Sequence, residues 1–235
     1  MTNAYQPEYQ APVANLAVQA RAQFIVRTYG HLLAAVVGFT LLEMWLFASG
    51  LAYPIARSML SVSWLFVMGG FVLASWLFRS LAHSARSRTT QYVGLAAFVA
   101  VEAIIFVPLL VAAQTVAPGT IQSAALVTLM GFVGLTAVAI TTRKDFSFLG
   151  SILRWGGILA LVAIVAGAIF GFQLGTFFSV AMVGLAGASI LYDTSNVLHH
   201  YSEDSHVAAA LELFASVALM FWYVLQLFMS SSRNN

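Results

Sequence analysis

Four carboxylates lie inside stretches of sequence that otherwise carry almost no charge: Glu43, Glu102, Asp193 and Glu212. An ionisable side chain is costly inside a bilayer, and such groups usually mark ion paths, proton relays or paired charges. Each of the four is therefore a candidate for binding a proton or attracting a cation. Glu43 and Glu102 also allow a plainer interpretation, in which each is protonated and only hydrogen-bonds a neighbouring helix.

Asp193 needs a partner from elsewhere in the chain. It directly follows a run without a charged side chain, from Trp155 to Tyr192, and Lys and Arg are absent for many positions on either side. A cation that neutralises it must therefore belong to another helix.

The composition requires a membrane protein. Of 235 residues, 61% are hydrophobic and 8% are charged, and the mean hydropathy is +0.90. A soluble domain cannot cover so much apolar surface with so few charges. A spanning helix needs about 20 apolar residues, so the length allows roughly seven spans in one all-α, polytopic bundle.

Charges, Pro and Gly divide the apolar sequence into seven expected transmembrane helices. They cover about residues 31–49, 61–79, 91–113, 121–142, 152–171, 175–198 and 207–229. The uncharged run from Trp155 to Tyr192 would extend roughly 57 Å as one helix, against about 30 Å of hydrocarbon. It must fold back, and "GFQLG" at Gly171–Gly175 is the predicted turn.

The distribution of cations predicts the orientation. With seven spans and the N-terminus in the cytoplasm, eight Lys and Arg residues lie inside, and only Arg57 and Arg233 lie outside. The eight are Arg21, Arg27, Arg79, Arg86, Arg88, Arg143, Lys144 and Arg154. This excess predicts a cytoplasmic N-terminus and an external C-terminus. The net charge of +2 comes mainly from these loops, so it indicates a lipid bilayer rather than a nucleic acid as the partner.

Three regions follow. Residues 1–23 lack the continuous apolar core of a signal peptide and are expected to form a polar, mobile tail. Residues 24–229 form the seven-span membrane domain, and residues 230–235 a short C-terminal tail.

The topology also predicts how deep the charged residues lie in the membrane. Arg79 ends the second span, Asp193 lies about one turn before the exit of the sixth, and Glu212 lies within two turns of the start of the seventh. These three are expected in the cytoplasmic third of the membrane, with Glu43 and Glu102 nearer the middle or the outer half.

Enzyme and cofactor sites find little support. The loop His199, His200, Glu203, Asp204 and His206 contains side chains that suit divalent metals, but such residues more often form a solvated loop. Their spacing fits no HExxH motif, and neither a GxSxG elbow nor a Walker loop occurs. The only lysine, Lys144, is in a loop, which excludes a retinal Schiff base. We expect neither an enzyme nor a cofactor.

Three segments resemble one family. "FIVRTYGHLLAAVVGF" at the first span, "TTRKDFSFLG" after the fourth and "ILYDTSNVLHHY" after the sixth are similar to the Bax inhibitor-1 family, from about Phe24 to Phe228. The short loops resemble a bacterial member of the inner (plasma) membrane. The resemblance implies a bundle in which the last helix is surrounded by the other six.

The resemblance also implies a gate. Some family members are pH-sensitive calcium leaks, closed by an arginine at the inner end of span two that the span-six aspartate holds; these positions read Arg79 and Asp193. A second family aspartate belongs in span seven, where "LFASV" places Ser216. Glu212 precedes Ser216 by four residues, on the same helix face, and is the candidate substitute.

Two functions therefore stay open. The first is a cation leak for calcium, with Asp193 as sensor, Arg79 as its latch and Glu212 as second carboxylate. The second is a non-conducting regulator of a membrane-anchored ATP-dependent protease, to which some bacterial relatives lacking that aspartate are linked. The N-terminal tail, with Tyr5, Pro7 and Tyr9, is a candidate contact for such a partner, although tails of this composition are usually disordered.

Overall fold

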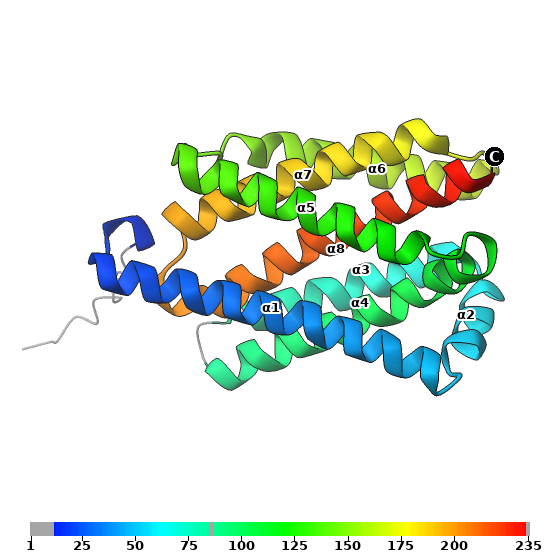
Figure 1. Cartoon of the computed structure of the whole chain (residues 1–235), viewed down its shortest axis with the longest axis horizontal. Helices are drawn as coiled ribbons and strands as arrows, with labels where there is room; N and C mark the ends of the chain where they lie inside the picture. Colours follow the sequence, from blue (N-terminus) through cyan, green and yellow to red (C-terminus); the bar gives the residue numbers. More distant parts are fainter. Residues whose placement is uncertain (1–11, 85–86, 234–235) are drawn as a thin grey trace, which may run out of the picture.

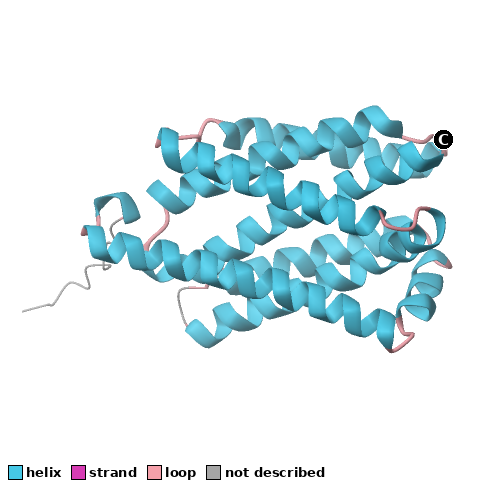
Figure 2. Cartoon of the chain, viewed as in Figure 1, coloured by secondary structure: helices cyan, strands magenta, loops and turns pink. Residues whose placement is uncertain are grey.

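Every regular element is a helix over the part of the chain that the structure, a computed structural model, describes: residues 12–84 and 87–233 (Figures 1 and 2). The α-helices are α1 (Val18–Ala48), α2 (Ala52–Leu60), α3 (Trp64–Ala82), α4 (Arg88–Val116), α5 (Thr120–Thr142), α6 (Leu149–Phe170), α7 (Gly175–His199) and α8 (His206–Arg233). All except α2 are long and apolar enough to cross a membrane. The prediction of an all-α, polytopic membrane protein with seven spans is confirmed.

The last helix, α8, lies in the middle of the bundle. It packs against α1, α3, α4, α5 and α7, and in Figure 1 it passes between a group formed by α5, α6 and α7 and a group formed by α1, α3 and α4. In its most apolar stretch 67% of the residues are buried, against 6% for α6, which lies at the edge. Side chains on several faces of α8 therefore meet other helices.

The turn between α6 and α7 is where the sequence places it. Helix α6 ends at Phe170 and α7 begins at Gly175. Gly171 and Gly175 have φ angles of 75° and 69°, in the left-handed region that glycine adopts without a steric cost. The two glycines thus let the long apolar run fold back.

Helix α2 was not predicted. At nine residues it is roughly 14 Å long, which is too short to cross the membrane. The length and hydropathy of apolar stretches, which predict the spans, therefore do not predict this helix. Its Pro54 lies in the first turn, where proline is tolerated. The helix packs on α4 through Ala52 and Ala56, which are buried with Leu46 and Val107.

The predicted N-terminal tail differs in part from the structure. Residues 1–11, with Tyr5, Pro7 and Tyr9, lie outside the described residues. Beyond them, the Val13 side chain is fully buried and its N–H donates to the Tyr201 carbonyl at 2.8 Å. Helix α1 begins at Val18, so the boundary expected at residue 23 falls inside the first span. At the other end, α8 continues to Arg233 through most of the predicted C-terminal tail.

Candidate functional site

Arg79 and Glu212 form an ion pair where α3 ends and α8 begins. The Arg79 Nη1 donates to Glu212 Oε2, and the two side chains are 38% and 20% exposed. The His83 Nε2 lies 3.7 Å from the other carboxylate oxygen, Oε1. The carboxylate thus has a permanent cation on one side and an imidazole on the other.

Helix α4 fixes the end of α3 that carries Arg79. A Cβ atom added to Gly94 would lie 2.6 Å from the Ala82 nitrogen and 2.8 Å from the Phe78 oxygen, so only glycine lets the two backbones approach this closely. One turn further along α4, the ring of Phe98 lies 5.2 Å from the Arg79 guanidinium carbon, within the range of a cation–π contact. The guanidinium therefore has two partners, one ionic and one aromatic.

Asp193 has a different partner. Its side chain is buried, and its Oδ2 accepts a hydrogen bond of 2.5 Å from the Ser216 hydroxyl. Ser216 lies one turn beyond Glu212 on α8, so α8 contributes Glu212 to Arg79 and Ser216 to Asp193. Ser216, which stands where the resemblance implies a second aspartate, gives Asp193 a hydroxyl donor in place of a second carboxyl group.

The expected pair of Arg79 with Asp193 is not the contact seen. Among the ion pairs of the described residues, Arg79 contacts Glu212 and not Asp193. Glu212 lies one helical turn nearer the start of α8 than Ser216, close to the last turn of α3 that carries Arg79. The three residues do lie at one end of the bundle, but the pair of Arg79 with Asp193 that the sequence predicted is replaced by a pair of Arg79 with Glu212.

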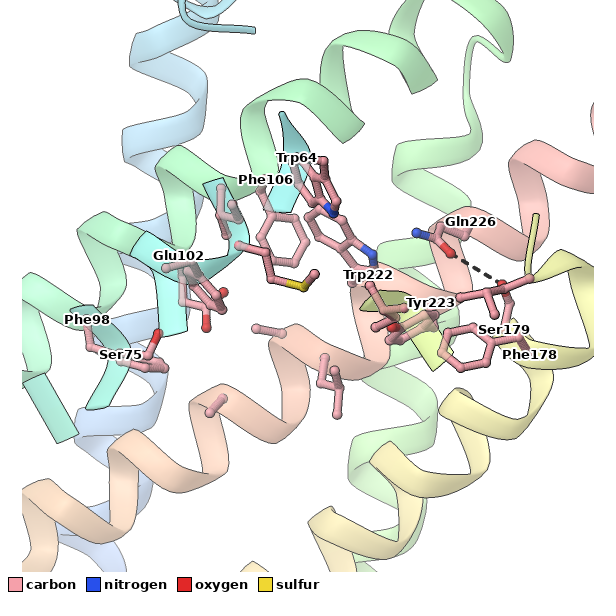
Figure 3. Close-up of a pocket in the computed structure, with 18 of the residues that line it drawn as sticks. Trp64, Ser75, Phe98, Glu102, Phe106, Phe178, Ser179, Trp222, Tyr223 and Gln226 are labelled. Carbon is pink, nitrogen blue, oxygen red and sulfur yellow. Dashed lines mark hydrogen bonds between the residues drawn. The ribbon is translucent and has the colours of Figure 1, made fainter. Parts of the chain in front are cut away.

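A cavity of about 620 Å³ extends from this cluster into the bundle. Arg79 lines one end of it, and Trp64, at the other end of α3, lines the opposite end, roughly 22 Å away along the helix. Figure 3 shows Glu102 and Ser75 on one side and the Trp64, Trp222 and Phe106 rings beside them. The cavity thus contains one carboxyl group between an aromatic end and an arginine end.

Further along α8, a polar contact joins the cavity wall to α7. The Ser179 hydroxyl donates to Gln226 Oε1 at 3.3 Å, as drawn in Figure 3. Glu43, the remaining carboxylate of the sequence analysis, is not part of this cavity. It lines a separate one between α1 and α5.

The loop "KDFSFLG" holds α7 next to Asp193. Asp145 accepts hydrogen bonds from the Ser147 N–H at 2.9 Å and from the Ser195 hydroxyl at 3.4 Å, and it contacts His200 Nε2 at 3.1 Å. The Phe146 N–H donates to the Ser195 oxygen at 2.9 Å. The Ser147 N–H, followed by the His200 imidazole, lowers the pKa of Asp145 to about 2. This role could not be predicted from the sequence, because Asp followed by Ser indicates a local turn but not a contact with the distant Ser195.

The predicted metal candidates do not converge. His199 Nδ1 lies 2.9 Å from the Ser195 carbonyl, His200 contacts Asp145, and the His206 ring lies 5.1 Å from that of His31. In the described part of the chain, no group of three His, Cys, Asp or Glu side chains is placed to hold a metal ion. His199, His200 and His206 thus each serve a separate contact.

The comparison with known families agrees with this architecture. The model of the family described as inhibitor of apoptosis-promoting Bax1 matches residues 21–234. The chain therefore belongs to the Bax inhibitor-1 family.

Three relatives illustrate the similarity. An uncharacterized protein of Pseudomonas aeruginosa is 36% identical over 111 residues, 46% of this chain and 49% of the relative. The Escherichia coli protein named modulator of FtsH protease YccA is 31% identical over 108 residues, with the same two shares. Bax inhibitor 1 of Schizosaccharomyces pombe is 30% identical over 224 residues, 92% of this chain and 79% of the relative. The chain thus spans about half the length of these two bacterial relatives.

Proposed function

We propose that this chain is a gated cation leak, with calcium as the ion to test first. One observation carries the proposal: the cavity that contains Glu102 ends at the Arg79 guanidinium, which Glu212 holds in place. A carboxyl group inside a membrane cavity attracts cations, and a guanidinium at its end repels them. The same ion pair thus closes the path.

Opening requires Arg79 to leave the path. Loss of the negative charge that faces Arg79 frees the guanidinium, already 38% exposed, to turn toward the solvent. Asp193 contacts α8, the helix that carries Glu212, through its hydrogen bond with Ser216. Acidification on the inner side therefore favours the open state, and Glu212 rather than Asp193 is the direct partner of the arginine.

The orientation is part of the proposal. The excess of Lys and Arg on one side predicts a cytoplasmic N-terminus and an external C-terminus in a bacterial inner membrane. A relative from a second Escherichia coli strain is named an inner membrane protein. A reporter fused to each end tests the orientation, and activity of both reporters on one side would contradict it.

Calcium flux into liposomes that contain the purified protein tests the leak. We expect flux that rises as the pH falls, and constitutive flux at neutral pH for Arg79→Gln and Glu212→Gln. Glu43→Gln is the matched control, because Glu43 lines the other cavity and its loss should leave the flux unchanged. The absence of calcium flux from the wild type and from both gate variants at every pH would refute the leak.

A second candidate is a modulator of a membrane-anchored ATP-dependent protease. The name of the Escherichia coli relative supports it. The test measures degradation of a membrane substrate by such a protease in liposomes, with and without this chain. A change in rate that persists in a variant lacking calcium flux would support modulation, and an unchanged rate would exclude it. Neither candidate requires catalysis by this chain.

A further inference from the structure

A second cavity, of about 610 Å³, lies between α1 and α5, and residues of α4 and α8 also line it. Helix α1 packs on α4 and α8, whereas α5 packs on α7 and α8, and α8 is visible between α1 and α5 in Figure 1. Three residues that line it, Leu33, Met44 and Leu129, are more than half exposed on the outer surface of the bundle. In a membrane this surface meets hydrocarbon, so the cavity can be entered sideways from the lipid.

One ionisable group belongs to this cavity. Glu43 is 93% buried, both of its carboxylate oxygens are buried, and neither has a hydrogen-bond partner within the described chain. A buried carboxylate without a partner is costly, and buried polar groups in native proteins are normally satisfied. The missing partner therefore points to an occupant of the cavity.

The chemistry of the lining selects a cation. The residues that line the cavity include no Lys, Arg or His, so an anionic or phosphate-bearing molecule would find no opposite charge. Phe39 and Phe47 precede and follow Glu43 by four residues, on the same face of α1, and both line the cavity. A carboxylate flanked by aromatic rings is the surrounding that an ammonium group prefers.

The cavity is also polarised along its length. Glu43, Gln114 and Gln122 all line the end where α1 and α4 finish and α5 begins. From Glu43 to Leu32, roughly 16 Å along α1, the lining is almost entirely apolar. A single aliphatic chain suits that part, with its head group beside Glu43, and the volume lies in the range of ligand sites.

We propose that this cavity binds a lipophilic ammonium cation carried on one alkyl chain, with Glu43 as its counter-ion and Phe39 and Phe47 beside its head group. This site is separate from the gate at Arg79, so it stands or falls independently of the leak.

Carboxyl labelling in the intact protein tests the proposal. Dicyclohexylcarbodiimide is an apolar reagent that adds to a buried carboxyl group, and mass spectrometry reads each labelled peptide. The protein is held in dodecyl maltoside micelles, which contain no ammonium group. Glu102 is the internal control, because it is as buried as Glu43 but lines the other cavity. The probe is dodecyltrimethylammonium, and neutral dodecanol is its match in chain length.

We expect dodecyltrimethylammonium to slow the labelling of Glu43 at a concentration at least about tenfold below that needed with dodecanol. The labelling of Glu102 should not change. Equal protection by dodecanol would mean an apolar cavity without charge selection and would overturn the proposal. Equal protection of Glu102, or no labelling of Glu43, would overturn it as well.

Thermal stability gives a second measurement. The same probe should raise the melting temperature of the wild type and of Glu102→Gln, but not that of Glu43→Gln. If Glu43→Gln cannot be purified, the labelling of the wild type still decides. A rise in melting temperature that Glu43→Gln retains would overturn the proposed role of the carboxylate.

Discussion

The contact between Arg79 and Glu212 predicts a coupling free energy that Arg79 and Asp193 should lack. The perturbation is a double-mutant cycle built from Arg79→Gln, Glu212→Gln and the double variant. A second cycle replaces Glu212→Gln by Asp193→Asn. Arg79 loses its contact with Phe98 in both cycles, so that loss cancels when the two coupling energies are compared.

The solvent exposure of Arg79 and Glu212 determines how large their coupling free energy should be. Surface ion pairs contribute about 0–1 kcal/mol, whereas breaking a buried pair costs about 3–5 kcal/mol. The side chains of Arg79 and Glu212 are 38% and 20% exposed, between these limits. His83 at 3.7 Å remains as a neighbour of Glu212 when Arg79 is replaced, which reduces the cost. We therefore expect a coupling of about 1–3 kcal/mol, or about 2–12 °C in melting temperature for a chain of this size.

The assay is thermal unfolding of the purified proteins in detergent at neutral pH. Arg79→Lys is the matched control, since it keeps the charge and should retain most of the stability. For the cycle with Asp193→Asn we expect coupling below about 0.5 kcal/mol, the level of independent sites. A coupling with Asp193 that equals or exceeds the coupling with Glu212 would refute this assignment of the pair and restore the contact first expected from the sequence.

Three further substitutions test the surroundings of the pair. Ser216→Ala removes the donor to the buried Asp193 carboxyl group and should cost about 1–3 kcal/mol, whereas Ser216→Thr keeps the hydroxyl; equal melting temperatures would contradict the contact. Gly94→Ala places a Cβ 2.6 Å from the Ala82 nitrogen and should destabilise the protein by about 1–3 kcal/mol, while Ala at Gly69, which has open space around it, should not. Asp145 has a folded pKa of about 2 against an ordinary value of 3.8, so its contribution is present above pH 4 and is lost as the pH falls toward 2. Asp145→Asn should therefore lower the melting temperature at pH 5 and approach the wild type near pH 2; a constant difference would exclude the charge as the cause.

The spans could be predicted because the bilayer imposes a simple rule on the sequence. Every backbone polar group must be satisfied within the membrane, so a long apolar run has to be a helix of about 20 residues. The same rule predicts the turn at Gly171–Gly175. The rule does not predict α2, because that helix lies outside the spans. It also does not predict the burial of Val13, which depends on a contact with a loop nearly 190 residues away.

The sequence could predict how deep the residues of the site lie in the membrane, but not which of them contact one another. Topology places Arg79, Asp193 and Glu212 at the same end of the bundle, and it correctly makes Glu212 and Ser216 neighbours on one face. The choice of partner depends on how each helix is rotated about its own axis. A rotation of one residue, about 100°, exchanges one neighbour for another, and hydropathy does not determine it when a helix such as α8 is buried on several faces.

The segments that carry the family resemblance meet at one end of the molecule. Phe24, from the first segment, lies with its ring 6.5 Å from that of Tyr201, which ends the third. The second segment contacts the third where Phe146 and Asp145 bond to Ser195, two residues after Asp193. Parts of all three segments are thus gathered at the end of the bundle that carries Arg79 and Glu212.

Glu102 separates the two candidates. It lies in the middle of α4 and lines the cavity beyond Arg79, away from the end of the bundle that carries the ion pair. A leak needs that carboxyl group along the ion path, so Glu102→Gln should reduce calcium flux by about tenfold or more, if the lost attraction is worth at least 1.4 kcal/mol. A modulator acts through the surface that its partner reaches, so the same change should leave protease modulation intact. Glu102→Gln keeps the shape of the side chain, and its melting temperature serves as the control for folding. A variant that is fully stable and conducts calcium as well as the wild type would show that ions do not pass Glu102, and the cavity would then have no role in a leak.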